Sequence, residues 1–393
     1  MNSASKALAL AWLFALSSSD SAQAGSLLQI RDTTRYIERL QDAAALGDLS
    51  SLDLQQKIML QLEKDISLST PEQLSEPRNV KAVALYLLSG GNPNAIAKAY
   101  ANIKIENEEY RTLLDASLAY ARSNKEEAHA AIGKLDLENL PANIGGRLYI
   151  AQAILIADSD PIAAIASLKR ASVIMHGTMV EEASLRRCAS FAAKANDIKN
   201  FEDCSGNYIR RFAKSIYWKD FAASLAISSA SIDDAKNFFY ESWLKPTLDE
   251  LPVPIQLDVM LGIAQHSVPL GNFILANKCA VRAVQLSDEK SSERNRGLLY
   301  ASASMLGLNE VLLAASKLHL INVTKLVGED LYLYNKAISV LEQIHAVASS
   351  KSMGAESKTQ SSPDTQSKSF EDLIARADLL LKQVDAELMR PSQ

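Results

Sequence analysis

The segments Asp197-Ile198-Lys199-Asn200-Phe201 and Asp234-Ala235-Lys236-Asn237-Phe238 lie 37 residues apart and share the pattern D-x-K-N-F. They belong to a series of expected helix starts at intervals of 37 residues, which are Ser123, Asp160, Asp197, Asp234, Gly271 and Leu308 with Asn309. A period of roughly 34 to 40 residues in Ala- and Leu-rich sequence is typical of stacked helix pairs, because each pair buries its apolar face only against its neighbours. The sequence therefore predicts an all-α fold, an α-α superhelix of tetratricopeptide-like (TPR-like) helical hairpin repeats.

Capping residues mark several of the expected helix boundaries. Thr70-Pro71-Glu72-Gln73 offers a capping threonine, a proline in the first turn and a capping-box glutamine. Asn92-Pro93 and Asp160-Pro161 repeat the cap followed by proline, and Thr178 with Glu181 forms a second expected capping box. Apolar residues recur every three or four positions between these marks, and no alternating run of β-branched residues indicates a strand.

The first 24 residues have the pattern of a cleavable export signal. They contain the single basic residue Lys6, an apolar run from Ala7 to Leu16 and a final Ala22-Gln23-Ala24. The apolar run is about half the roughly 20 residues that a membrane-spanning helix needs, so a retained anchor is the weaker interpretation. Residues 1–24 are therefore predicted to be a signal peptide, and the mature protein is expected to be exported, without a direct membrane span.

Composition divides the rest of the chain into four stretches. Residues 25–105 have a helical pattern that does not follow the 37-residue interval, and we expect them to form an N-terminal helical cap region. Residues 106–349 form the expected TPR-like solenoid, with an irregular repeat or a bend where Pro246, Pro252 and Pro254 interrupt it. Residues 350–369 contain seven serines in twenty and are predicted to be a flexible linker.

The last stretch, residues 370–393, is predicted to be a C-terminal amphipathic helix. Its apolar residues form a single stripe, which consists of Phe370, Leu373, Ile374, Ala377, Leu380, Leu381, Val384 and Leu388. Such a stripe needs a partner surface. It either folds back on the solenoid, which is the simpler interpretation, or docks on another protein.

Charge and cysteine content restrict the partners and the redox state. The formal net charge is −5, and it is unchanged in the mature chain because Lys6 and Asp20 leave together. Mild acidity argues against nucleic acid or an anionic membrane surface as the main partner, since both select for clustered basic residues.

The three cysteines, Cys188, Cys204 and Cys279, make an odd set for an oxidising compartment. Cys188 and Cys204 lie eight residues on either side of Asn196, so a turn there between antiparallel helices would place them opposite each other at a distance that a disulfide can span. A disulfide between them is therefore one interpretation. Buried free thiols are the alternative that we favour, because Cys is an ordinary small core residue in packed helices.

Catalytic motifs are missing from the sequence. It contains no G-x-S-x-G, H-E-x-x-H, C-x-x-C, phosphate loop or G-x-G-x-x-G. Glu126-x-x-His129 and Glu342-x-x-His345 match half of a di-iron motif, but such a site needs two further inward glutamates, so we interpret both as solvated helix faces. We therefore expect no enzyme activity, no metal and no cofactor.

One charged cluster is a candidate for binding a partner. Its six members are Glu181, Glu182, Arg186, Arg187, Arg210 and Arg211. Glu182 and Arg186 are four residues apart and can pair on one helix face. The simpler interpretation of the cluster is solvated surface, and the functional one is a polar rim around a binding groove, where Arg is over-represented.

Three segments together resemble the MotC family of periplasmic motility proteins. They follow a signal peptide in this order: Ser75-Glu76-Pro77-Arg78-Asn79-Val80 leading to Leu88-Ser89-Gly90-Gly91-Asn92-Pro93, then Gly177-Thr178-Met179-Val180-Glu181-Glu182-Ala183-Ser184-Leu185-Arg186-Arg187, then Tyr208-Ile209-Arg210-Arg211-Phe212-Ala213. The resemblance extends from about residue 31 to about residue 230. It implies a protein that is needed for flagellar rotation and that binds the periplasmic part of the stator protein MotB, with no catalytic residues.

Two other functions are compatible with a helical repeat. One is an exported TPR-like scaffold for cell-envelope assembly or cell-wall enzymes. The other is an α-superhelical cell-wall lyase, which would need a lysozyme-like domain with a catalytic glutamate. The stretch after residue 310 is too short and too repetitive to supply that domain.

Overall fold

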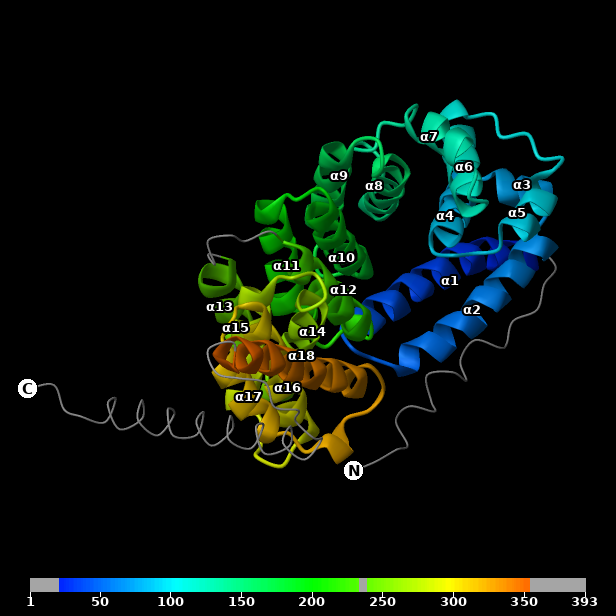
Figure 1. Ribbon diagram of the computed structural model, residues 1–393. Helices are drawn as coiled ribbons and strands as arrows, with labels where there is room; N and C mark the ends of the chain where they lie inside the picture. Colours follow the sequence, from blue (N-terminus) through cyan, green and yellow to red (C-terminus); the bar gives the residue numbers. More distant parts are fainter. Residues whose placement is uncertain (1–20, 233–238, 354–393) are drawn as a thin grey trace, which may run out of the picture. The chain divides into compact units, whose positions relative to one another are not determined.

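The structure is a computed structural model that describes residues 21–232 and 239–353 (Figure 1). Every regular element in these two ranges is a helix. The predicted all-α fold of helical hairpins is therefore confirmed. Residues 1–20 of the predicted signal peptide, the segment Asp234–Phe238, and most of the predicted linker with the whole predicted tail helix lie outside the described residues.

The first of two compact units comprises the chain up to Phe191 together with Arg210–Trp218. Helix α1 packs on α2 as a hairpin, as do α6 on α7 and α8 on α9, and α4 contacts α1, α6 and α8 (Figure 1). The helices of this unit are α1 (Ser21–Ala45), α2 (Ser50–Leu68), α3 (Pro71–Ser75), α4 (Pro77–Leu88), α5 (Pro93–Tyr100), α6 (Glu108–Ala121), α7 (Lys125–Ile132), α8 (Ala142–Ile156), α9 (Pro161–Ile174) and most of α10 (Met179–Lys194).

The second unit comprises Ala192–Ile209 and the chain from Lys219 onward. Each of α14, α15, α16 and α17 packs on the next, and α18 contacts α16 and α17. The helices here are most of α11 (Ile198–Phe212) and α12 (Trp218–Ser231), the π-helix η1 (Tyr240–Leu244), α13 (Lys245–Asp249), α14 (Val253–Ser267), α15 (Phe273–Leu286), α16 (Ser292–Gly307), α17 (Val311–His319), the 3-10 helix η2 (Val323–Lys325) and α18 (Gly328–Met353).

The irregular repeat expected around the three prolines lies in the second unit. There η1 leads into the five-residue α13, which has Pro246 in its first turn, and α14 begins next to Pro252 and Pro254. Proline removes a backbone donor but is tolerated in a first helical turn, so these residues break the regular hairpin into short helices.

The positions that recur every 37 residues lie at the turns inside the hairpins. Helices α7, α9, α11, α15 and α17 all begin within three residues after one of these positions. At or beside four of these positions the backbone is left-handed, at Ser123 (φ 60°), Asn196 (φ 54°), Gly271 (φ 75°) and Asn309 (φ 65°). The N–H of the next residue bonds to the carbonyl five residues before it, as in Asn272 to Ser267 (3.0 Å). This is the Schellman motif, which closes a helix and sets the exit direction of the chain.

Helix α4 is the centre of the first unit. It is buried on nearly all sides, since every residue from Val80 to Leu87 except Lys81 is buried. One apolar cluster takes Val80, Val83 and Tyr86 from α4 together with residues of α1 and α2, and a second takes Ala84 and Leu85 together with residues of α6 and α8. A helix that is apolar all round belongs in a core, so α4 holds the hairpins on both of its sides.

The left-handed turns predict an order of stability among substitutions at Gly271. A Cβ at this position meets no atom within 4 Å, so only backbone strain acts. We expect Gly271→Ala to lower the free energy of unfolding by about 1–2 kcal/mol, since that is the strain of a left-handed residue with a Cβ. Gly271→Asn is the control, because Asn occupies the corresponding left-handed turn at Asn196 and Asn309. Urea unfolding should rank Gly271→Asn above Gly271→Ala, and equal midpoints would contradict this assignment.

Candidate functional site

The two glutamates of the candidate cluster are buried, so their interpretation as solvated surface is wrong. Glu181 is 4% exposed and Glu182 is 0% exposed. Glu181 accepts a hydrogen bond from the backbone N–H of Gly177 (2.6 Å) and pairs with Arg211 Nη2 (3.0 Å), with His176 Nδ1 3.3 Å away. These partners replace the water that Glu181 loses on burial, which is the condition for keeping a carboxylate inside a fold. Glu181 and Arg211 thus form an ion pair that is part of the fold.

The expected capping box at Thr178 and Glu181 differs from the structure. Thr178 Oγ1 accepts a hydrogen bond from the backbone N–H of Val180 (3.2 Å) and donates one to the carbonyl of Met175 (2.6 Å). The Glu181 carboxylate bonds to the N–H of Gly177 rather than to that of Thr178. The nearby Arg211 guanidinium and His176 ring hold the carboxylate in this position. The box at Thr70 and Gln73, in contrast, forms as predicted.

The arginines of the cluster differ in their contacts and in their exposure to solvent. Glu182 and Arg186 pair as expected, through Nε to Oε1 (3.0 Å) and Nη2 to Oε2 (3.2 Å), and the Arg186 guanidinium lies 5.0 Å from the centre of the Tyr217 ring. Arg210 is exposed. Arg187 is half-buried and donates to the carbonyl of Ala183 (3.4 Å). The cluster is therefore not one surface.

Arg187 has an unusual electrostatic environment. Its pKa is lowered, first by burial and next by the neighbouring charge of Arg186. No carboxylate of the described residues lies within 4 Å of its guanidinium. A guanidinium stays charged in proteins, and the Glu182 carboxylate, which is itself paired with Arg186, offsets the charge of Arg187 only in part.

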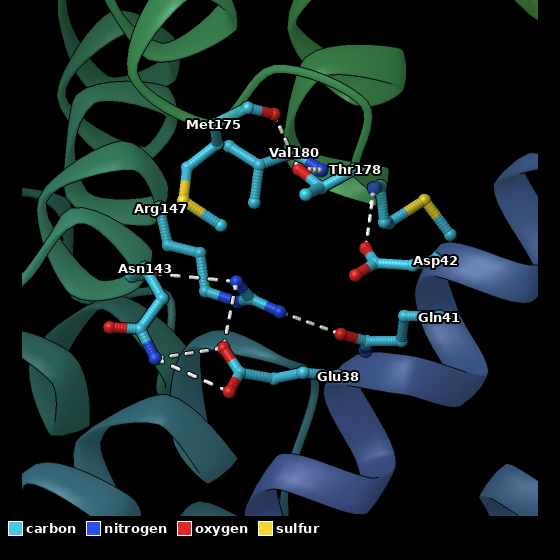
Figure 2. A network of polar contacts seen from close by, with 9 residues as sticks. Glu38, Gln41, Asp42, Asn143, Arg147, Met175, Thr178 and Val180 are labelled. Carbon is cyan, nitrogen blue, oxygen red and sulfur yellow. Dashed lines mark hydrogen bonds and ion pairs between the residues drawn. The ribbon is translucent and has the colours of Figure 1, made fainter.

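A polar network that the sequence analysis missed joins α1, α8 and the start of α10 (Figure 2). Arg147 is 8% exposed; its Nη2 donates to Gln41 Oε1 (2.7 Å) and its Nη1 lies 3.6 Å from Glu38 Oε1. Asn143 Nδ2 also donates to Glu38 (3.0 Å). The N–H of Met179 donates to Asp42 Oδ1 (2.8 Å). Buried polar groups satisfied in this way fix the helices that carry them in one arrangement.

The pKa values of this network show the effect of burial. Burial raises the pKa of Asp42, while the Met179 N–H and the charge of Arg147 act in the opposite direction. Burial also lowers the pKa of Arg147, against the charges of Glu38 and Asp42. The only local signal in the sequence is that polar residues 38, 41 and 42 share one face of α1 with the buried Ile37 and Ala45.

A groove runs across the first unit. It consists of two adjoining hollows, of about 760 and 170 Å³, which share Leu88 and Tyr120 in their walls. Residues of α2, the end of α4, the end of α6 and the end of α8 line the larger hollow, and Arg147 and Arg187 line the smaller one. We call this continuous surface the unit-1 groove.

The turn after α4 builds the floor of the groove. Tyr86 accepts a hydrogen bond from the N–H of Asn92 (3.0 Å), and its hydroxyl lies 3.3 Å from Glu63 Oε2. Gly91 lies against the Tyr86 ring, and any Cβ there would overlap that ring. The resembling segment Leu88–Pro93 thus lies in the groove wall, and Arg187 comes from the second resembling segment.

Metal-binding and membrane-spanning features are not found in residues 21–232 and 239–353. Glu126 and His129 are exposed on α7, so the solvated-face interpretation holds for that pair. No group of three or more His, Cys, Asp or Glu in these ranges is placed to hold a metal ion. Within the same ranges, none of the helices combines the length and the apolar character that crossing a bilayer requires.

Helical hairpins packed around a groove, with buried ion pairs between them, define a helical-repeat protein. A model of the family described as Chemotaxis protein MotC matches residues 1–393, and the chain belongs to this family. The chain is also 27% identical over 312 residues to the chemotaxis protein MotC of Rhizobium meliloti (strain 1021). That match covers 79% of this chain and 71% of the relative. The family expected from three short segments is therefore confirmed.

The buried network predicts a large difference between two otherwise similar substitutions. Arg147→Met leaves the Glu38 carboxylate without its cation, and we expect it to lower the free energy of unfolding by about 3–5 kcal/mol. Arg170→Met is the control, because Arg170 pairs with Glu138 where both side chains are about half exposed (50% and 52%). Its effect should be about 0–1 kcal/mol. Chemical unfolding monitored by circular dichroism checks both values, and similar losses would rule out a structural role specific to Arg147.

The cysteines allow a separate test. Cys188 and Cys204 are buried half-cystines, so the free thiols that we favoured from the sequence are wrong for these two residues. Cys279 is a buried free thiol whose pKa is raised by burial. A bond between Cys188 and Cys204 stays a prediction. Alkylation in denaturant should then label one cysteine per chain before reduction and all three after it, as measured by mass spectrometry. Labelling of all three without reductant would instead support free thiols.

Proposed function

We propose that this chain is a periplasmic motility protein required for flagellar rotation, and that it acts by binding the periplasmic part of the stator protein MotB. The match of the whole chain to the chemotaxis protein MotC family carries the proposal. The export-signal pattern of residues 1–24 supports the compartment. The role of the protein is then to bind and not to catalyse.

The geometry supports a binding role in one further way. The unit-1 groove is lined by helix ends and turns that are held by buried bonds, so it is preformed. A preformed surface loses little conformational entropy on binding. Such a groove can hold a segment of the stator and favour the stator state that engages the cell wall or opens the proton path. The energy for that shift comes from the difference in affinity for the two stator states.

A strain that lacks this protein tests the proposal. We expect flagellated cells that do not swim, because the filament assembles but the stator is not held in its working state. Expression of the full chain should restore swimming, and expression of residues 25–393 alone should not, because that variant lacks the export signal. Swimming halos and electron microscopy of the filaments measure the two effects.

Two results would contradict the proposal. Normal swimming of the deletion strain would exclude a role in rotation. Paralysis accompanied by altered cell shape or sensitivity to detergents would favour the envelope-scaffold function instead.

A further inference from the structure

We infer that the unit-1 groove binds an amphipathic helix of the partner protein, with the apolar face of that helix on α2, α4 and α8 and one Asp or Glu side chain at Arg187. This inference rests on the proposed function, because the partner is the periplasmic part of the stator. It adds the site on this chain and the chemistry of the segment that the site accepts.

The apolar part of the groove is open to a ligand. Half-buried Met59, Leu88, Ile154 and Leu155 line the larger hollow, and Leu60 stands at its wall with 63% of its surface exposed. These side chains come from three helices, α2, α4 and α8. An apolar surface shared by several helices is what an amphipathic helix needs for docking.

The apolar surface continues beyond the hollow along α2. Leu49 and Leu52 are 70% and 39% exposed, and their spacing from Gln56 and Leu60 places all four on one face of the helix. Exposed leucines at helical spacing next to a hollow form a strip rather than a compact pocket. A strip fits an elongated partner segment better than it fits a small molecule.

The polar end of the groove requires a negative charge. Arg147 in the smaller hollow is already balanced by Glu38. Arg187 forms no ion pair within 4 Å among the described residues. The carboxylate of Glu182 attracts its charge but is hydrogen-bonded to two nitrogens of Arg186. A partly desolvated guanidinium whose charge is only partly offset favours a further carboxylate, with which it can form two parallel hydrogen bonds.

Charges elsewhere on the groove do not compete for the same group. At the larger hollow, Glu63 accepts from Asn92 Nδ2 (3.0 Å) and lies beside the Tyr86 hydroxyl, so it is occupied within the fold. Lys125 is exposed at the edge of the hollow. The groove therefore has a net positive character at Arg187, although the whole chain carries a net charge of −5.

Binding of the purified mature chain to the periplasmic part of MotB, measured by calorimetry, tests the inference. We expect Leu60→Glu to weaken binding by about tenfold or more, since a charge in an apolar contact is desolvated without a partner. Ile162→Glu is the matched control, because Ile162 is 76% exposed on α9 and does not line the groove. Both positions are exposed, so both variants should fold, and circular dichroism checks this.

Arg187→Gln tests the polar end. We expect it to weaken binding about three- to thirtyfold and to reduce the effect of added salt, since one charge-assisted contact is lost. Arg39→Gln is the control, because Arg39 is exposed on α1 and outside the groove lining. Hydrogen–deuterium exchange of the wild-type complex should show added protection in residues 56–63, 86–93 and 120–125.

The outcomes separate the two proposals. If the wild-type chain does not bind, the proposed function is overturned and the groove assignment with it. If it binds and the groove variants bind as tightly as their controls, or if protection falls elsewhere, only the groove assignment is wrong. If the free chain shows this protection and loses it when residues 354–393 are removed, the occupant is the chain's own C-terminal stretch, which also overturns the assignment.

Discussion

The contact between the Tyr86 ring and the bare face of Gly91 is the constraint on which the first unit depends. It folds the chain back over the end of α4, and the same tyrosine then receives the N–H of Asn92 and lies beside Glu63 on α2. One aromatic side chain thereby joins the central helix, the turn that follows it and a neighbouring hairpin. Helix α4 is buried on nearly every side, so its position fixes the positions of the helices that pack against it. The turn after α4 also forms the floor of the groove.

Buried charged residues fix the register between helices, which apolar packing alone does not. Leu and Ala side chains hold helices together without specifying how far one helix slides along another, since many positions bury a similar area. The network of Arg147 with Glu38 and Gln41 is satisfied in one register only, because donors and acceptors must meet within hydrogen-bond distance. Glu181 with Arg211 does the same for the start of α10. The result is a groove whose walls come from separate hairpins and still keep a fixed spacing.

The sequence predicts those features that depend on neighbouring residues. The helical period, the hairpin turns and the cap at Thr70 all follow from local conformational preferences, and the structure agrees with them. Features that depend on distant residues were missed or misread. Glu181 reads as a surface residue because nothing within one helical turn shows that Arg211 will cover it. Arg147 and Gln41 are 106 residues apart, so no spacing rule joins them. The groove depends on both kinds of feature. The turn after α4 is recognisable in the sequence, whereas the wall that faces this turn depends on contacts between distant residues.

The end of α1 has a consequence for how the chain reaches its folded state. Gly47 lies against the backbone of Lys214, and the carbonyl of Ala44 accepts a hydrogen bond from the N–H of Ile216 (3.3 Å). Asp42 likewise accepts its hydrogen bond from Met179, which is 137 residues later in the chain. A polypeptide that emerges from a ribosome or a secretion channel with its N-terminus first therefore exposes α1 long before its partners exist. Closing such long loops is slow, so the first unit becomes complete only after more than half of the chain has been delivered.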